Sequence, residues 1–102
     1  MQFEFDEKID QSIQKSIRAA VRLYKERQKL AQESGNRQSP PSYEEFESEV
    51  MQIMESNKQA ELNKLRTLGL RDLFDRAWAQ RLLNYATRKD MRDSHEALMR
   101  RY

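Results

Sequence analysis

The sequence predicts an all-α protein, built as an antiparallel bundle of three long helices. Only two Gly and two Pro interrupt its 102 residues, so the chain has few places to turn. Apolar residues recur at helical spacing, and charged residues (35%) nearly equal hydrophobic ones (37%), which leaves each helix a narrow apolar stripe. We expect a single domain over 1–102, with helices at about 6–34, 42–68 and 70–101 and a loop at 35–41.

The first helix is predicted from a periodic apolar face. Ile9, Ile13 and Ile17 are spaced by four residues, and Tyr24 extends the same face. Gly35 follows the last periodic turn, where a residue with a left-handed backbone commonly ends a helix. The helix should therefore run from about residue 6 to residue 34.

The segment SPPSYEEF admits two interpretations, a peptide ligand or a helix start. Its Pro-Pro-x-Tyr is the short ligand that WW domains bind in an extended conformation. Its Ser-x-x-Glu is a capping box, in which Ser42 accepts from the Glu45 amide and the Glu45 side chain bonds back to Ser42, while Pro41 and Phe46 are placed to form a hydrophobic staple. Because Tyr43 in a first helical turn cannot present an extended ligand, we predict a helix start.

The second helix is expected to span 42–68 and to end at Gly69. A left-handed Gly69 would close that helix, whereas Gly inside a continuous helix would cost ~1 kcal/mol. This helix also carries two methionines, Met51 and Met54. They are either core filler or part of an adaptable binding surface.

The third helix, 70–101, is predicted from a clear helical pattern after Gly69. Its continuity is the open point, because Asp90 followed by Asp93 is a pattern that caps a separate last helix. The helix is therefore expected either to be continuous or to be broken near 88–90.

Composition argues against several classes of chemistry. Without Cys and with a single His, neither disulfides nor a zinc site is expected. The chain has no Gly-rich phosphate loop, and we expect no cofactor and no metal. No apolar run approaches the length of a membrane span, and the acidic start MQFEFDEKID is unlike a secretory signal. We expect a cytoplasmic protein that does not act at a membrane.

Charge is arranged in blocks, although the net charge is only +2. Residues 15–29 carry six basic side chains and one acid, and residues 43–62 carry six Glu and one Lys. Residues 64–101 are basic again, with ten basic and five acidic side chains. Blocks of opposite sign favour antiparallel packing of neighbouring helices. The basic blocks also make nucleic acid a possible partner.

One line of aromatic and basic residues stands out on the last predicted helix. Steps of four and three residues connect Phe74, Trp78, Arg81, Tyr85, Arg88, Arg92, His95, Met99 and Tyr102. Its aromatic half is either core or a hot spot, and its basic half either borders the core or binds a partner. We predict a partner-binding site made of Trp78, Arg81, Tyr85, Arg88, Arg92 and His95.

The stretch RKDMRDSH, from Arg88 to His95, resembles the Arg-x4–6-His signature of HEPN ribonucleases. These are small all-helical domains that dimerise and thereby pair two such motifs. The resemblance implies that Arg88 contacts phosphate and that His95 transfers a proton. It covers only these eight residues, so we rank this enzymatic interpretation third.

The expected function is therefore that of a small non-enzymatic interaction protein, a regulator or adaptor that binds a protein partner. Helices this long in so short a chain leave a thin bundle, so we also expect self-association into a homo-oligomer, most of all through helices 6–34 and 42–68. The first alternative is a nucleic-acid-binding module that uses basic helix faces, and the second is a HEPN-like ribonuclease.

Overall fold

The computed structural model describes residues 5–102, which form four α-helices and no β-strand. The helices are α1 (Asp6–Glu33), α2 (Tyr43–Leu62), α3 (Leu68–Leu82) and α4 (Tyr85–Met99). The predicted all-α class is confirmed. The predicted number of three helices is wrong, because the C-terminal segment is divided into two.

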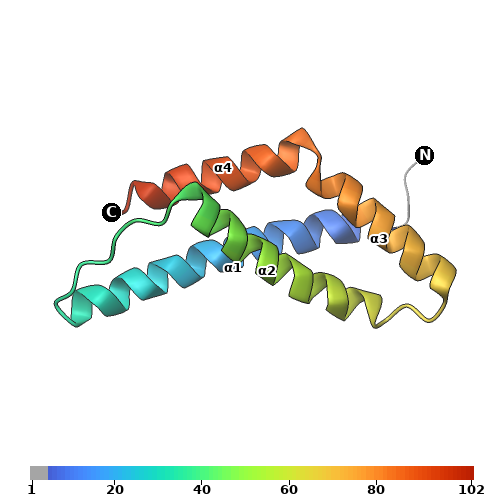
Figure 1. Ribbon diagram of the computed structural model, residues 1–102, viewed down its shortest axis with the longest axis horizontal. Coiled ribbons are helices and arrows are strands. Elements are labelled where there is room, and N and C mark those ends of the chain that lie inside the picture. Colours follow the sequence, from blue (N-terminus) through green and yellow to red (C-terminus); the bar gives the residue numbers. More distant parts are fainter. Residues whose placement is uncertain (1–4) are drawn as a thin grey trace.

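Helices α1 and α2 form an antiparallel pair, with an ion pair toward each end of α1. Lys8 Nζ lies 3.2 Å from a Glu61 carboxylate oxygen, and Arg27 lies 3.5 Å from Glu49. Because an early residue of α1 meets a late residue of α2 and the reverse, the two helices run in opposite directions. Figure 1 shows α2 crossing α1 at an angle, with α3 and α4 returning along the other side of α2.

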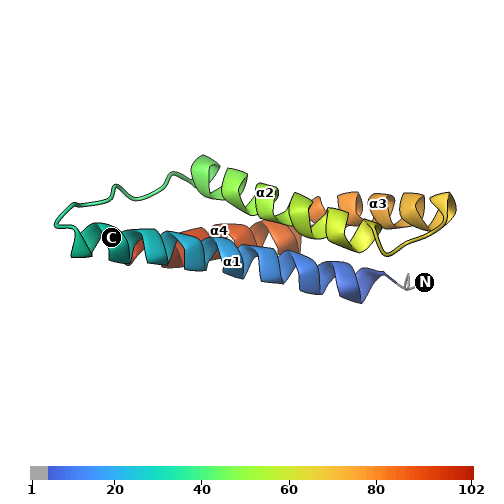
Figure 2. The same ribbon diagram turned by 90° about the horizontal axis from the view of Figure 1, so that it is seen from below.

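The four helices are arranged in two layers. Figure 2 shows α1 and α4 together in one layer and α2 and α3 in the other. The bundle is elongated, with extents of 52 × 26 × 18 Å. Its core draws on all four helices and consists of Ile9, Ile13, Ile17, Ala20, Tyr24, Phe46, Val50, Met54, Leu62, Phe74, Ala77, Trp78, Met91 and Leu98.

The end of α1 follows the sequence prediction. Gly35 has a φ of 76°, its amide donates to the Gln32 carbonyl at 3.1 Å, and the Asn36 amide donates to the Ala31 carbonyl at 2.8 Å. This pair of hydrogen bonds around a left-handed glycine is a Schellman motif, which satisfies the last carbonyls of the helix. The helix ends at Glu33, one residue before the predicted position.

The start of α2 is also as predicted. Ser42 has an extended backbone, and its Oγ accepts a hydrogen bond from the Glu45 amide at 3.1 Å. No bond returns from the Glu45 side chain to the Ser42 amide within residues 5–102, so only half of the predicted capping box forms. Tyr43 is the first residue of the helix, and Pro41 and Phe46 are both buried.

The predicted end of the second helix is wrong. α2 stops at Leu62, and Gly69 is the second residue of α3 rather than a cap. Gly35 is the one residue of 5–102 with a left-handed backbone. Gly69 therefore does not adopt the left-handed conformation that was predicted to end the second helix. Thr67 sets the boundary instead, since its Oγ1 accepts from the Leu70 amide at 3.2 Å.

The predicted continuous helix at 70–101 is wrong as well, and so is the alternative break near 88–90. The chain turns at Leu83 and Asn84, where Asn84 Oδ1 accepts from the Ala86 amide at 3.1 Å and caps α4. Asp90 and Asp93 lie inside α4 and cap nothing. Figure 1 shows α3 and α4 meeting at an angle above α2.

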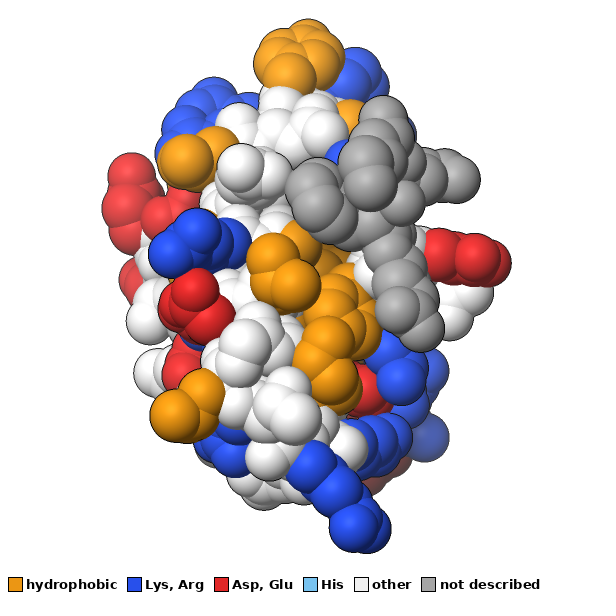
Figure 3. Space-filling view, turned by 90° about the vertical axis from the view of Figure 1, so that its right-hand side faces the viewer, with side chains coloured by type: hydrophobic (Ala, Val, Ile, Leu, Met, Phe, Trp, Pro, Cys, Tyr) orange, Lys and Arg blue, Asp and Glu red, His pale blue; other side chains and the backbone are white. Residues whose placement is uncertain are grey.

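Several leucines of α3 are exposed. Leu68 is 86% exposed, Leu70 41% and Leu73 48%. They lie at the end of the molecule where α1 begins and where α2 is joined to α3. Figure 3 shows hydrophobic side chains gathered at this end. Such a group is typical of a surface that another chain covers.

Candidate functional site

The turn at 83–84 divides the predicted line of aromatic and basic residues. Phe74 and Trp78 are buried in the core, with Trp78 only 2% exposed. Tyr85, the first residue of α4, is 77% exposed. The core interpretation of the aromatic half therefore holds for Phe74 and Trp78 but not for Tyr85, and Trp78 is not available to a partner.

Arg81 belongs to the framework of the fold. Its guanidinium lies 3.1 Å from an Asp10 carboxylate oxygen and 3.6 Å from Asp6, so it joins the end of α3 to the start of α1. Its Nε is buried and lacks a hydrogen-bond partner among the described residues. The side chain is directed at α1 and not at a partner.

His95 holds α4 against the start of α2. Its Nε2 lies 2.9 Å from the Pro41 carbonyl oxygen, and since a carbonyl only accepts, the ring must donate from Nε2. The ring also packs edge-on against Tyr43 and lies 5.6 Å from the Phe46 ring. A nitrogen engaged in this way is unavailable for proton transfer until the hydrogen bond breaks.

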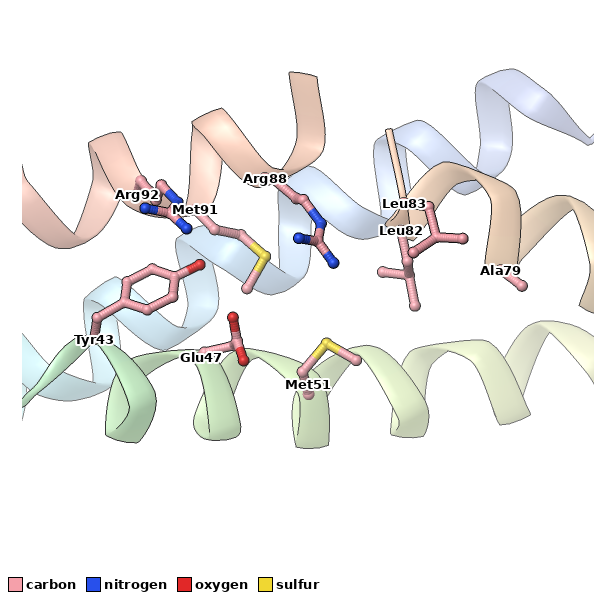
Figure 4. Close-up of a pocket in the computed structure, with 9 residues that line it drawn as sticks. All are labelled: Tyr43, Glu47, Met51, Ala79, Leu82, Leu83, Arg88, Met91 and Arg92. Carbon is pink, nitrogen blue, oxygen red and sulfur yellow. The ribbon is translucent and has the colours of Figure 1, made fainter. Parts of the chain in front are cut away.

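Arg88 and Arg92 lie on the wall of a groove. The groove lies between α2 on one side and the α3–α4 corner on the other, and its volume is about 380 Å³. Figure 4 shows side chains from both sides directed into it. It is lined by Tyr43, Glu47, Met51, Ala79, Leu82, Leu83, Arg88, Met91 and Arg92. We call this the α2–α4 groove.

Charged groups gather at the Tyr43 end of the α2–α4 groove. The Arg92 guanidinium lies over the Tyr43 ring, 5.3 Å from its centroid. Burial, and after it the neighbouring Glu47 carboxylate, raise the pKa of the Tyr43 hydroxyl above its usual value. Arg88 is exposed and forms no ion pair with any residue of 5–102. Arg92 forms no ion pair with these residues either, but it lies over the Tyr43 ring, so Arg88 is the groove cation without a charged or aromatic partner among residues 5–102.

The rest of the groove is apolar. Met51 is 41% exposed and Leu83 71%, whereas Met91 beneath them is only 4% exposed. Methionine side chains are flexible and polarizable, so they adjust to differently shaped ligands. Of the two methionines singled out in the sequence, Met54 is core at 1% exposure and Met51 faces the groove.

Sequence reasoning identified the two Arg residues of this groove and missed most of its other lining residues. Met51 had a signal, as a candidate for an adaptable surface. Tyr43 was considered as a WW ligand or as a residue of the first helical turn, but not as part of a groove. Leu82 and Leu83 had no signal. They line the groove because the chain turns at 83–84, and neither Gly nor Pro marks that turn in the sequence.

Residues 5–102 lack a metal-binding cluster and a membrane-spanning helix. These residues contain no group of three or more His, Cys, Asp or Glu side chains placed to hold a metal ion. None of the helices α1 to α4 is both long enough and apolar enough to cross a membrane.

Comparison with known proteins gives no independent guide to the site. No protein-family model matches the chain, and neither a curated protein nor a solved structure matches it significantly.

Proposed function

We propose that this chain is a non-enzymatic interaction module that binds a segment of a protein partner in the α2–α4 groove. One observation supports this proposal above the others. The groove places the exposed apolar side chains of Met51 and Leu83 beside Arg88, a guanidinium without an ion-pair partner among residues 5–102. Apolar area with a small number of placed polar groups is typical of a protein-binding site.

The chemistry of the groove defines the kind of partner segment. Tyr43, Glu47 and Met51 lie on successive turns of α2 and extend about 12 Å along it. That length matches about two turns of a helix or four residues of an extended strand. Arg88 favours a carboxylate in that segment, because its planar fork of N–H donors matches a carboxylate in two-point geometry. The partner should therefore present an Asp or Glu next to a large apolar residue.

The expected affinity is moderate. Burying one large apolar side chain contributes about 1.5–3 kcal/mol, and association itself costs several kcal/mol in lost freedom. A groove of about 380 Å³ accepts one or two such side chains. A dissociation constant on the order of micromolar is consistent with these contributions.

Self-association remains part of this proposal, at a different surface. The motivating residues are the exposed Leu68, Leu70 and Leu73 of α3, whereas the apolar stripes of α1 and α2 are mostly buried. We therefore place the contact between copies on α3 and not, as the sequence suggested, on the first two helices.

A peptide-display selection against the purified protein tests the groove. We expect enriched peptides that combine an acidic residue with a large apolar one, and that lose at least tenfold in affinity for the double variant Arg88→Glu, Arg92→Glu. The matched control is Arg66→Glu, Arg71→Glu, which makes the same charge change at exposed positions outside the groove. Equal binding to wild type and to the groove variant would place the site elsewhere, the acidic face of α2 being the next candidate.

A further inference from the structure

A second surface of the molecule collects positive charge that the α2–α4 groove does not use. Four basic residues of α1 follow one another at steps of four, three and four positions, and Arg101 joins them from the end of the chain: Arg18, Arg22, Lys25, Lys29 and Arg101. Steps of three and four keep side chains on one line of a helix. We call these five residues the basic seam.

The basic seam borders a continuous depression between α1 and α4. One hollow of about 400 Å³ is lined by Arg18, Arg22 and Lys25 together with Ser94 and Ala97 of α4. The next, of about 530 Å³, is lined by Arg22, Lys25, Lys29 and Arg101. Since the two hollows share Arg22 and Lys25, the depression follows the whole line.

None of the five cations is neutralised within residues 5–102. Other basic residues of α1 do form ion pairs, Lys8 with Glu61 and Arg27 with Glu49, but the seam residues form none. One carboxylate, that of Glu26, lines the depression. The seam therefore carries more positive charge than the net +2 of the whole chain, and this excess is local.

None of the three carboxylates of α4 lines the depression. Asp90 accepts a hydrogen bond from Gln14 at 2.6 Å, and Asp93 pairs with Lys89 at 2.6 Å. Glu96, the third carboxylate of α4, lines neither hollow.

The seam is also fixed in place by the fold. The Gln28 side chain, 7% exposed, donates from Nε2 to the Arg101 carbonyl oxygen at 2.8 Å. This bond holds the end of the chain beside α1. Four of the cations are therefore presented by α1, and Arg101, just after α4, is held beside them by this bond.

We infer that the basic seam binds the phosphate backbone of nucleic acid without reading its base sequence. From Arg18 to Lys29 the line is about 16 Å long, a length over which a strand offers several phosphates. No aromatic side chain lines either hollow, so bases have no surface there on which to stack. Recognition by charge alone is independent of sequence.

Two other polyanions fit the seam less well. A helix that lies on an anionic membrane needs large, exposed apolar side chains next to its basic face. Here Ile17 is recessed at 2% exposure, and Val21 is partly buried against the core. An acidic protein helix would press a convex surface against a narrow depression. A flexible nucleic-acid strand can follow that depression along its length.

This inference goes beyond the proposed function and does not depend on it, because α4 separates the seam from the α2–α4 groove. Fluorescence anisotropy of labelled 20-nucleotide single strands, of two unrelated sequences, tests it directly. We expect equal affinity for both sequences and a log–log salt slope of about −3, which corresponds to four or five phosphate contacts. Affinity should fall by about 60-fold between 50 and 200 mM salt.

Variants then locate the contact. Arg22→Glu with Lys25→Glu should weaken binding more than tenfold at low salt, and Arg22→Gln with Lys25→Gln should lower the slope by about 1.4. The control Arg66→Glu, Arg71→Glu carries the same charge change as the first variant and should lose at most twofold, with circular dichroism confirming the fold of all three. Absence of binding at 50 mM salt, or an equal loss in the control, would overturn the inference. So would tighter binding, at equal salt, to phosphatidylserine vesicles or to polyglutamate.

Discussion

Replacing His95 with Ala should destabilise the whole bundle, because the ring joins α4 to the start of α2. The substitution removes the hydrogen bond from Nε2 to the Pro41 carbonyl at 2.9 Å and leaves that carbonyl without its partner. It also removes the contacts with the Tyr43 and Phe46 rings, whose centroids both lie 5.6 Å away.

The magnitude follows from these contacts. A carbonyl deprived of its donor costs about 1–3 kcal/mol, and an aromatic pair contributes about 0.5–1.5 kcal/mol. The expected loss is about 2–4 kcal/mol of unfolding free energy, a large share of the 5–15 kcal/mol typical of a domain. At about 4–8 °C per kcal/mol, Tm should fall by at least about 8 °C.

Urea and thermal unfolding followed by circular dichroism measure this loss. His95→Phe keeps a ring without a donor, and His95→Gln keeps a donor without a ring, so each should retain part of the lost stability. A surface substitution usually changes the free energy of unfolding by no more than about 0.5 kcal/mol. If His95→Ala changes it by no more than that, the structural role assigned to His95 is wrong. If the purified protein cleaves RNA, and both this variant and Arg88→Ala lose cleavage while still folded, the HEPN-like interpretation gains support instead.

Three further predictions concern the frame of the molecule. Ser42→Ala should cost about 1 kcal/mol in urea unfolding, because it removes the cap of α2, and an unchanged midpoint would show that the cap contributes nothing. Light scattering at high concentration should give wild type a molar mass above that of the monomer, whereas the Leu73→Asp variant should stay monomeric. A wild type that is monomeric at every concentration would contradict the self-association proposal. Burial alone would raise the pKa of Glu61, but Lys8 and Lys64 outweigh it and hold this pKa below its usual value. The ionised form is thus favoured in the folded state. The stability advantage of wild type over Glu61→Gln should therefore be full above about pH 5 and should shrink as pH falls below 4. A difference in unfolding free energy that stays constant with pH would contradict this.

The sequence predicts those features of the fold that are set by local chemistry. The isoleucine face of α1, Gly35 at its end and Ser42 at the start of α2 each depend on residues within one or two turns. The division of the C-terminal segment was missed because tertiary packing decides it. Asn84 can cap a helix, but nothing near it forbids a continuous one. The turn lets α3 contact Asp10 and Lys58 while α4 contacts Gln14 and Pro41.

The candidate site was predicted in part for the same reason. Arg88 and Arg92 are one turn apart on α4, so periodicity alone places them together. Trp78 and Arg81 were assigned to the same site on the assumption of a continuous helix. Once the turn intervenes, Trp78 faces the core and Arg81 faces Asp10 of α1. The groove itself, formed between residues distant in the sequence, has no local signal.

The central claim, that the α2–α4 groove binds a partner segment, is tested most directly by a nuclear magnetic resonance titration. Uniformly ¹⁵N-labelled protein would be titrated with the tightest peptide from the display selection, and amide and methionine-methyl shifts would be followed. The account predicts the largest shifts at Tyr43, Met51, Arg88 and Met91, with saturation in the micromolar range and little change along the basic seam. Shifts concentrated on the exposed leucines of α3, with the groove residues unmoved, would contradict it.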